Sequence, residues 1–169
     1  MLTCACYRCC CVLKGHGQHI FKYEGGGASA LLGVAYHTIP NLADGTIRLD
    51  DIRAAARPDD QHYPRTSLVC LENTHNACGG RVLSAEYIHS VGSVARDELG
   101  VPCHIDGARI FNAAAAAGTS VKTLVGGADT ISICLSKGLG SPVGSVLVGK
   151  CTCAPVPVAH TRGLMLCLA

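Results

Sequence analysis

The sequence predicts an α/β fold in which a mostly parallel sheet is flanked by helices. Short runs of consecutive apolar residues are typical of strands buried in a parallel sheet, and they occupy residues 66–71, 101–105 and 131–135. Helical segments alternate with these runs, and strand, loop and helix repeated in that order is the pattern of a parallel sheet with helical crossovers. The 169 residues are enough for one domain with a substantial core.

The composition is that of a globular protein without a strong charge of either sign. Hydrophobic residues make up 49% of the chain, charged residues make up 15%, and the formal net charge is +2. This net charge is too small to indicate nucleic acid or a membrane surface as a partner. The longest apolar runs fall well short of the ~20 residues that a membrane-spanning helix needs. The start, MLTCACYRCCCVLKG, does not resemble a signal peptide, because Arg8 and several cysteines interrupt its apolar run.

The 12 cysteines are concentrated at the two ends of the chain. A secreted disulfide scaffold would have short loops and a small core, and this chain has neither, so we expect a reducing, cytoplasmic location. Zinc binding by the N-terminal cysteines is an alternative, which would use Cys4, Cys6, Cys9, Cys10 and Cys11. Their irregular spacing favours a cysteine-rich segment without metal.

The elements expected before residue 60 are short and separated by glycines. They are an extended segment at the end of residues 1–18, a helix at 28–32, a strand at 33–39, a turn at Asp44-Gly45 and a helix at 49–56. Residues 19–24 alternate weakly between apolar and polar side chains. Asp50 and Asp51 lie in the first turn of the last helix, where carboxylates suit the helix dipole.

The elements expected after residue 60 follow the α/β pattern more regularly. They are a strand at 66–71, a helix at 84–99, a strand at 101–105, helices at 113–117 and 120–125, a strand at 131–135 and an antiparallel return strand at 144–149. Ser84 is a candidate N-cap of the long helix, and Gly100 is a typical C-terminal stop. Residues 151–169 show neither helical nor strand periodicity.

Polar loops follow the three predicted parallel strands. His75 follows the first strand, Asp106 and Arg109 follow the second, and Lys137 follows the third. Ligands of open α/β sheets bind at the carboxyl ends of the strands. We therefore expect these four side chains to lie along one edge of the sheet.

Lys137 stands just past an apolar run, in ISICLSKGLG. We expect its surroundings to remove it from water, because desolvation lowers the pKa of an ammonium group and yields the neutral amine that a carbonyl cofactor requires. The alternative is a strand-end lysine whose charged head reaches solvent.

A lysine and a carboxylate on neighbouring strand ends are the pair that pyridoxal phosphate needs. Lys137 would carry the cofactor through its aldehyde, and Asp106 would pair with the protonated pyridine nitrogen. The alternative for Asp106 is a helix N-cap, and the alternative for Arg109 is a solvated residue in the first helical turn.

Three segments together resemble the low-specificity threonine aldolases, which are pyridoxal-phosphate lyases of the beta-eliminating lyase superfamily. They are LVCLENTHNACGGRVL (68–83), HIDGARIFNAAAAAG (104–118) and SICLSKGLGSPVGSVLVG (132–149). The likeness covers roughly residues 19–149, because HIFKYEGGG and ADGTIRLDDI also fit. It implies part of the large domain of the aspartate-aminotransferase fold, which is pyridoxal-phosphate fold type I.

The resemblance implies a role for five residues. Lys137 would carry the cofactor, Asp106 would bind the pyridine nitrogen, and Arg109 would help to bind the cofactor and the substrate carboxylate. His19 would stack on the cofactor ring and take part in catalysis. His75 would lie near the substrate hydroxyl and act as, or hold, the catalytic base.

The implied reaction is cleavage of L-threonine or L-allo-threonine to glycine and acetaldehyde, in threonine catabolism and glycine formation. Members of the family form dimers or tetramers, so a homo-oligomer with an amino-acid substrate is expected. The family has further sequence before His19 and after Gly149. We therefore expect a divergent segment at 1–18, a partial cofactor-binding domain at 19–149 and a divergent, irregular tail at 150–169, with weak or absent activity.

Three alternatives stay open at this point. The first is a non-catalytic, truncated product of a threonine aldolase gene. The second is another pyridoxal-phosphate-dependent beta-eliminating lyase. The third is a metal-binding protein built on the cysteine cluster.

Overall fold

A seven-stranded sheet forms the centre of the computed structural model, which describes residues 10–149 and 165–167. The strands, in the order in which they lie across the sheet, are β2 (Ala35–Ile39), β1 (Cys10–Gly15), β3 (Arg65–Glu72), β4 (Cys103–Asp106), β5 (Thr130–Cys134), β6 (Ser145–Gly149) and β7 (Met165–Cys167). Strands β2, β1, β3, β4 and β5 are mutually parallel, and β6 is antiparallel to β5. The predicted α/β class, the mostly parallel sheet and the antiparallel return strand are confirmed.

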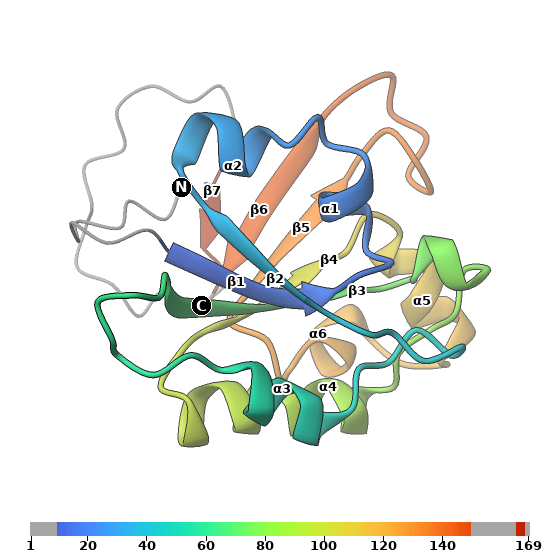
Figure 1. Cartoon of the computed structure of the whole chain (residues 1–169). Coiled ribbons are helices and arrows are strands. Elements are labelled where there is room, and N and C mark those ends of the chain that lie inside the picture. The colour runs from blue at the N-terminus through green and yellow to red at the C-terminus, as the bar shows by residue number, and fades with distance from the viewer. Residues whose placement is uncertain (1–9, 150–164, 168–169) are drawn as a thin grey trace.

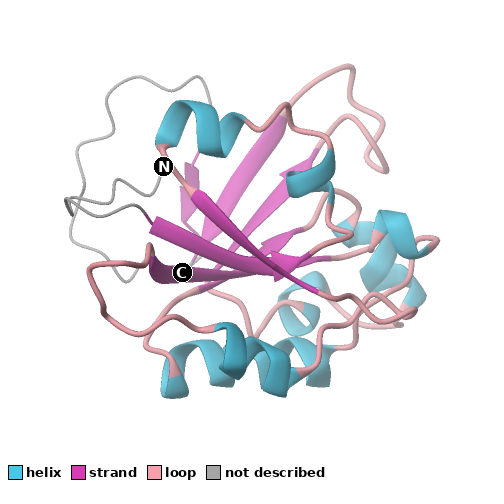
Figure 2. Cartoon of the chain, viewed as in Figure 1, coloured by secondary structure: helices cyan, strands magenta, loops and turns pink. Residues whose placement is uncertain are grey.

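Helices cover both sides of this sheet. They are α1 (His19–Lys22), α2 (Gly27–Leu32), α3 (Leu49–Ala55), α4 (Ala85–Ser93), α5 (Ile110–Ala116) and α6 (Val121–Leu124), with a 3₁₀ turn η1 (Asn76–Cys78) and a π-helical turn η2 (Val94–Glu98). Figure 1 shows α3, α4 and α6 on one side of the sheet and α1 and α2 on the other. Figure 2 shows that α1 and α2 are short. The larger helical layer therefore packs against one face only.

The main core lies between the sheet and this larger layer. Its fully buried side chains come from both, and include Leu13, Leu71, Ile105, Ile52, Ile88, Ile110 and Leu124. In β5, Ile131 and Ile133 are buried whereas Ser132 between them is only half-buried. One face of β5 thus points into the core, and the strand is not buried equally on both faces as its apolar sequence suggests.

The helix predicted at 84–99 is one continuous helical segment with a change of geometry. The Ser84 hydroxyl accepts a hydrogen bond from the Tyr87 N–H, which confirms the predicted N-cap. The segment continues from α4 into η2 and ends before Gly100, whose φ of +64° is the left-handed conformation that glycine favours.

Two short segments differ from expectation. Residues 19–22 form the helix α1, although their sequence alternates weakly like a strand. Residues 165–167 form β7 beside β6, in contrast to the irregular structure expected of the tail, because an open strand edge pairs with the backbone of a neighbour whatever its side-chain pattern. Residues 1–9, 150–164 and 168–169, which include Cys4, Cys6 and Cys9, lie outside the described part of the chain.

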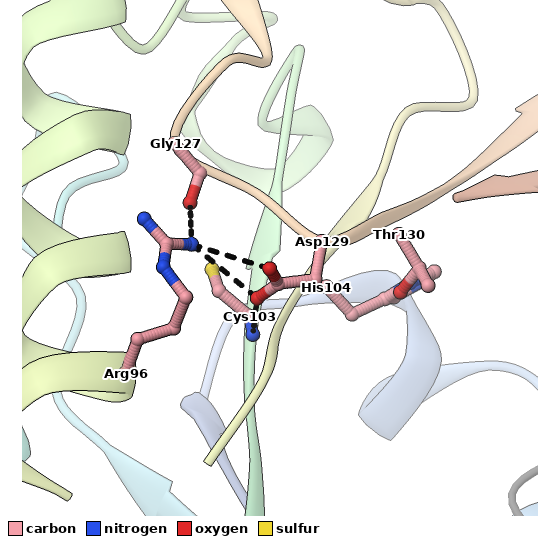
Figure 3. A network of polar contacts seen from close by, with 6 residues as sticks. All are labelled: Arg96, Cys103, His104, Gly127, Asp129 and Thr130. Carbon is pink, nitrogen blue, oxygen red and sulfur yellow. Dashed lines mark hydrogen bonds and ion pairs between the residues drawn. The ribbon is translucent and has the colours of Figure 1, made fainter. Parts of the chain in front are cut away.

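A polar network fixes the amino ends of β4 and β5 to the helical layer (Figure 3). The Asp129 carboxylate accepts the Cys103 N–H at 2.8 Å and pairs with the Arg96 guanidinium at 3.3 Å. Arg96 also donates to the Gly127 carbonyl at 2.5 Å. The network joins the helix α4–η2 to the start of both strands, so it restricts sliding of one strand along the other.

The backbone of α4 lies very close to the turn before β5. A Cβ added to Gly92 would lie 2.0 Å from the Gly127 carbonyl oxygen, and one added to Gly127 would lie 2.4 Å from the Ile88 carbonyl oxygen. Both neighbours are backbone atoms, which cannot rotate away as a side chain can. Only glycine at both positions permits this distance between helix and turn.

A lysine is buried outside the main core, next to helix α1. Lys14 in β1 is fully buried, and its ammonium group lies 4.2 Å from the centroid of the Phe21 ring and 5.0 Å from that of Tyr36. Burial lowers the pKa of Lys14 to about 8, although the neighbouring Cys70 and Glu72 act in the opposite direction. The two rings give the charged form partial compensation for lost hydration.

Gly92→Ala is expected to destabilise the fold by about 1–3 kcal/mol, because the methyl group forces α4 away from the turn at Gly127. The control is Gly27→Ala in α2, where a Cβ meets nothing within 4 Å. That change should alter the free energy of unfolding by less than about 1 kcal/mol. Urea denaturation of both variants measures the difference, and equal stability of the two would contradict the close approach.

Lys14→Met is expected to stabilise the protein at pH 7 by about 1–3 kcal/mol, because it removes a desolvated charge. Unfolded lysine holds its proton up to about pH 10.5, whereas folded Lys14 releases it at about 8. Below pH 8 the ammonium of Lys14 is charged in both states, so it lowers the free energy of unfolding by its full amount. The gain in stability of the Lys14→Met variant should therefore shrink as the pH rises toward 10.5.

The matched control for this prediction is Lys22→Met, which alters an exposed lysine in the neighbouring helix α1. Its free energy of unfolding should change by less than about 0.5 kcal/mol at every pH. Urea denaturation between pH 7 and pH 10 compares the two variants. A Lys14→Met variant that is destabilised, or whose gain does not vary with pH, would show that the buried ammonium carries no penalty.

Candidate active site

The carboxyl ends of β3, β4 and β5 meet at one edge of the sheet. Their register pairs Glu72 with Asp106, and Asp106 with Ser132. Beyond the strands, the Asn73 N–H donates to the Asp106 carbonyl at 2.9 Å, and the Gly107 N–H donates to the Ser132 carbonyl at 2.8 Å. The loops that carry the predicted site residues therefore leave the sheet side by side.

Asp106, the last residue of β4, is a half-buried carboxylate with a weak partner. It accepts the Ala108 N–H at 3.3 Å. Burial raises the pKa of Asp106, and the negative charge of Glu72 raises it further, while the Ala108 N–H, Lys137 and His19 act in the opposite direction. A cationic hydrogen-bond donor at this carboxylate would stabilise its ionised form, which burial disfavours.

The alternative role of Asp106 as a helix cap does not match the structure. The N-cap of α5 is Arg109, and it makes no side-chain capping bond. The Asp106 carboxylate instead closes a local turn by accepting the N–H of Ala108, two residues ahead. The Arg109 side chain is exposed at the same end of the sheet, so its guanidinium is accessible to an anion from solvent.

Lys137 lies in the loop after β5, and its side chain is exposed. The expectation that its surroundings desolvate it is wrong, because β5 ends at Cys134 and the loop carries Lys137 beyond the sheet. Its carbonyl accepts the Gly140 N–H at 3.0 Å, which closes a turn. Its charge nevertheless acts on Asp106, so the two groups share the edge.

Among the lysines that the structure describes, the desolvated one is Lys14, which the sequence analysis did not single out. Lys14 follows an apolar run and precedes a glycine in CCVLKG. Lys137 has the same local pattern in SICLSKG. Applying the criterion to both runs would have found it. The pattern marks a strand end, but it does not say which lysine lies beneath aromatic side chains.

His19 begins helix α1 at the same edge. Its backbone N–H donates to the Glu72 carboxylate at 2.6 Å, and its ring Nδ1 lies 2.9 Å from a carboxylate oxygen of Glu24. The ring also packs against Tyr23 at a centroid distance of 4.8 Å. His19 is therefore oriented by two acidic residues, one through its backbone and one through its ring.

His75 lies in the interior, with a fully buried side chain. Within the described residues, neither of its ring nitrogens has a hydrogen-bond partner. Glycines make room for it, since a Cβ would come within 2.8 Å of the His75 side chain at Gly45 and within 3.3 Å at Gly17. Burial lowers the pKa of His75, Glu72 raises it and His16 lowers it, which favours the neutral imidazole.

Glu72 is a further residue of this edge that the sequence analysis did not select. It is 4% exposed, and its two carboxylate oxygens accept the N–H groups of His19 and Asn76. The available signal was a carboxylate directly at the end of the apolar strand 66–71. The predicted strand stops one residue short of it, whereas β3 includes Glu72 as its last residue.

Cys4, Cys6 and Cys9 of the metal-binding alternative lie outside the described residues, so the structure does not test it. The described residues contain no group of three or more His, Cys, Asp or Glu side chains arranged to hold a metal ion. Cys10 and Cys11 belong to β1. In the part of the chain that is described, no helix has the length and apolar character needed to cross a membrane.

Comparison with known proteins relates the whole of this region to one family. The family model for beta-eliminating lyases matches residues 1–155. The chain is 54% identical over 141 residues to the probable low-specificity L-threonine aldolase 2 of Arabidopsis thaliana, covering 82% of this chain and 39% of that protein. It is 46% identical over 138 residues to the low specificity L-threonine aldolase of Escherichia coli K12, covering 82% and 40%.

A solved structure shares the fold. The threonine aldolase of Leishmania major superposes with a TM-score of 0.70 at 24% identity, over 80% of this chain and 39% of that one. The chain thus spans about 40% of the length of the curated relatives cited above. The family model matches most of the chain, which shows that the chain belongs to the beta-eliminating lyase family.

Proposed function

We propose that this chain binds pyridoxal 5'-phosphate and acts on L-threonine or L-allo-threonine, yielding glycine and acetaldehyde. The observation that carries the proposal is the position of Asp106, a half-buried carboxylate that lacks a strong partner and shares its edge with Lys137. Identity of 54% to a probable low-specificity threonine aldolase supports the choice of substrate. We also propose a cytoplasmic homo-oligomer, by analogy with these relatives.

The residues of the edge fit the cofactor. The exposed amine of Lys137 is available to its aldehyde. Asp106 would accept a hydrogen bond from the protonated ring nitrogen, which is the cationic donor that its raised pKa calls for. When bound, the cofactor supplies an electron sink for cleavage of the bond between the α and β carbons of the substrate.

The remaining residues would handle the substrate. Arg109, exposed at the start of α5, would bind its carboxylate. A base is needed to take the proton of the β-hydroxyl group, and the neutral imidazole of His75 has the protonation state for this role near neutral pH. His19 would face the cofactor ring from the start of α1.

A second candidate is a chain that binds the cofactor without turning over substrate. The burial of His75 favours it, because a fully buried ring does not reach a substrate at the edge of the sheet. The pairing of the His19 ring with Glu24 favours it as well. The two candidates agree on Lys137 and Asp106 and differ in the release of acetaldehyde.

Borohydride reduction of the protein incubated with pyridoxal phosphate is expected to attach the cofactor to Lys137. Peptide mapping locates the label, and Lys137→Ala should lose it while the exposed-lysine control Lys122→Ala keeps it. Lys14, with its pKa of about 8, is the competing amine. Label on Lys14 with none on Lys137 would reject the assignment.

Asp106→Asn is expected to slow threonine-dependent release of acetaldehyde by about 100-fold or more, because a neutral amide does not hold the proton on the ring nitrogen. Cofactor attachment to Lys137 should survive the change. Asp97→Asn, on the exposed end of the α4–η2 helix, is the control. Release by Asp106→Asn at the parent rate would refute the role of Asp106, and attachment without release in the parent would favour the second candidate.

A further inference from the structure

Glu72 binds two backbone N–H groups that belong to different loops. One oxygen of its buried carboxylate accepts the His19 N–H at 2.6 Å, in the segment after β1. The other oxygen accepts the Asn76 N–H at 2.8 Å, in the segment after β3. Charge-assisted hydrogen bonds of this length in a buried place are among the stronger ones in proteins.

Both N–H groups stand at the beginning of a helical turn. His19 is the first residue of α1, and Asn76 is the first residue of η1. The residues in the capping positions, Gln18 and His75, make no side-chain capping bond of their own. Gln18 instead donates its side-chain amide to the Cys70 carbonyl at 2.9 Å. The Glu72 carboxylate therefore accepts the first N–H of two helical turns that have no side-chain cap of their own.

These two turns carry the two histidines of the candidate site. His19 is held at the first position of α1, and His75 directly precedes η1. Glu72 also pairs in register with Asp106 on the next strand, and its charge acts on both Asp106 and His75. Glu72 is therefore linked to both histidine-bearing turns and to Asp106.

We propose that Glu72 is a positioning residue that fixes the turns of His19 and His75 relative to Asp106. It does so by accepting one N–H from each turn while its own strand sets the register with Asp106. The functional part of this inference rests on the proposed function, whereas the positioning itself concerns the protein without cofactor.

The test of the positioning is amide hydrogen exchange of the cofactor-free protein. In Glu72→Gln one oxygen is replaced by an NH₂ group, which cannot accept a hydrogen bond. Exchange at His19 or Asn76 should therefore quicken by about tenfold or more, while Ile105 and Ile131 in the core keep their protection. Glu86→Gln, at an exposed glutamate in the first turn of α4, is the matched control and should change neither amide.

A second readout separates positioning of the site from local support alone. The pH profile of the visible absorbance of the lysine-bound cofactor should shift in Glu72→Gln and also in Glu72→Asp, which keeps the negative charge, and stay as in the parent in Glu86→Gln. Should Glu72→Gln fail to fold, Glu72→Asp keeps the charge but shortens the reach, and it should show the same faster exchange.

Unchanged exchange at both amides would overturn the positioning, and faster exchange with an unchanged absorbance profile would overturn its functional part. If the parent protein does not bind the cofactor, the proposed function fails, and the exchange result still decides whether Glu72 holds the two turns. Faster exchange confined to His19 and Asn76 would then support the positioning by itself.

Discussion

The parallel register of β3, β4 and β5 is the constraint on which the candidate site depends. It aligns Glu72, Asp106 and Ser132 across three strands, so the loops after them leave at one edge. The opposite ends of β4 and β5 are fixed by Asp129, which binds the Cys103 N–H and the Arg96 guanidinium. A shift of one residue would break that network, and it would also turn each strand's buried face away from the core. The register of the sheet therefore sets the relative positions of the site residues on these strands.

Two neighbouring carboxylates at this edge have different hydrogen-bond partners. Glu72 has both oxygens engaged by N–H groups, at 2.6 and 2.8 Å. Asp106 has one bond at 3.3 Å, and its pKa is raised by burial and by the charge of Glu72. The satisfied carboxylate suits a structural task, and the unsatisfied one suits a ligand that brings a positive charge and a donor.

The sequence predicted the sheet and the helices of the main core, because strands and helices alternate as short apolar runs and helical segments. It placed Asp106 and Lys137 at one edge because both follow parallel strands. It did not predict the helix at 19–22, whose first N–H donates to the Glu72 carboxylate, more than 50 residues away in sequence. It also did not separate Lys14 from Lys137. Both follow apolar runs, and only the tertiary positions of Phe21 and Tyr36 make one of them buried.

The placement of His75 is the last feature that the local sequence does not explain. A buried imidazole with two unpaired ring nitrogens in the described structure costs roughly 1–3 kcal/mol for each polar group that loses water. The fold accepts this cost and provides the space, because Gly45, at a φ of +88°, and Gly17 stand where any Cβ would press on the ring. Packing alone would favour an apolar side chain in that space. Burial lowers the pKa of His75, so the fold holds this imidazole in its neutral form although the charge of Glu72 acts in the opposite direction.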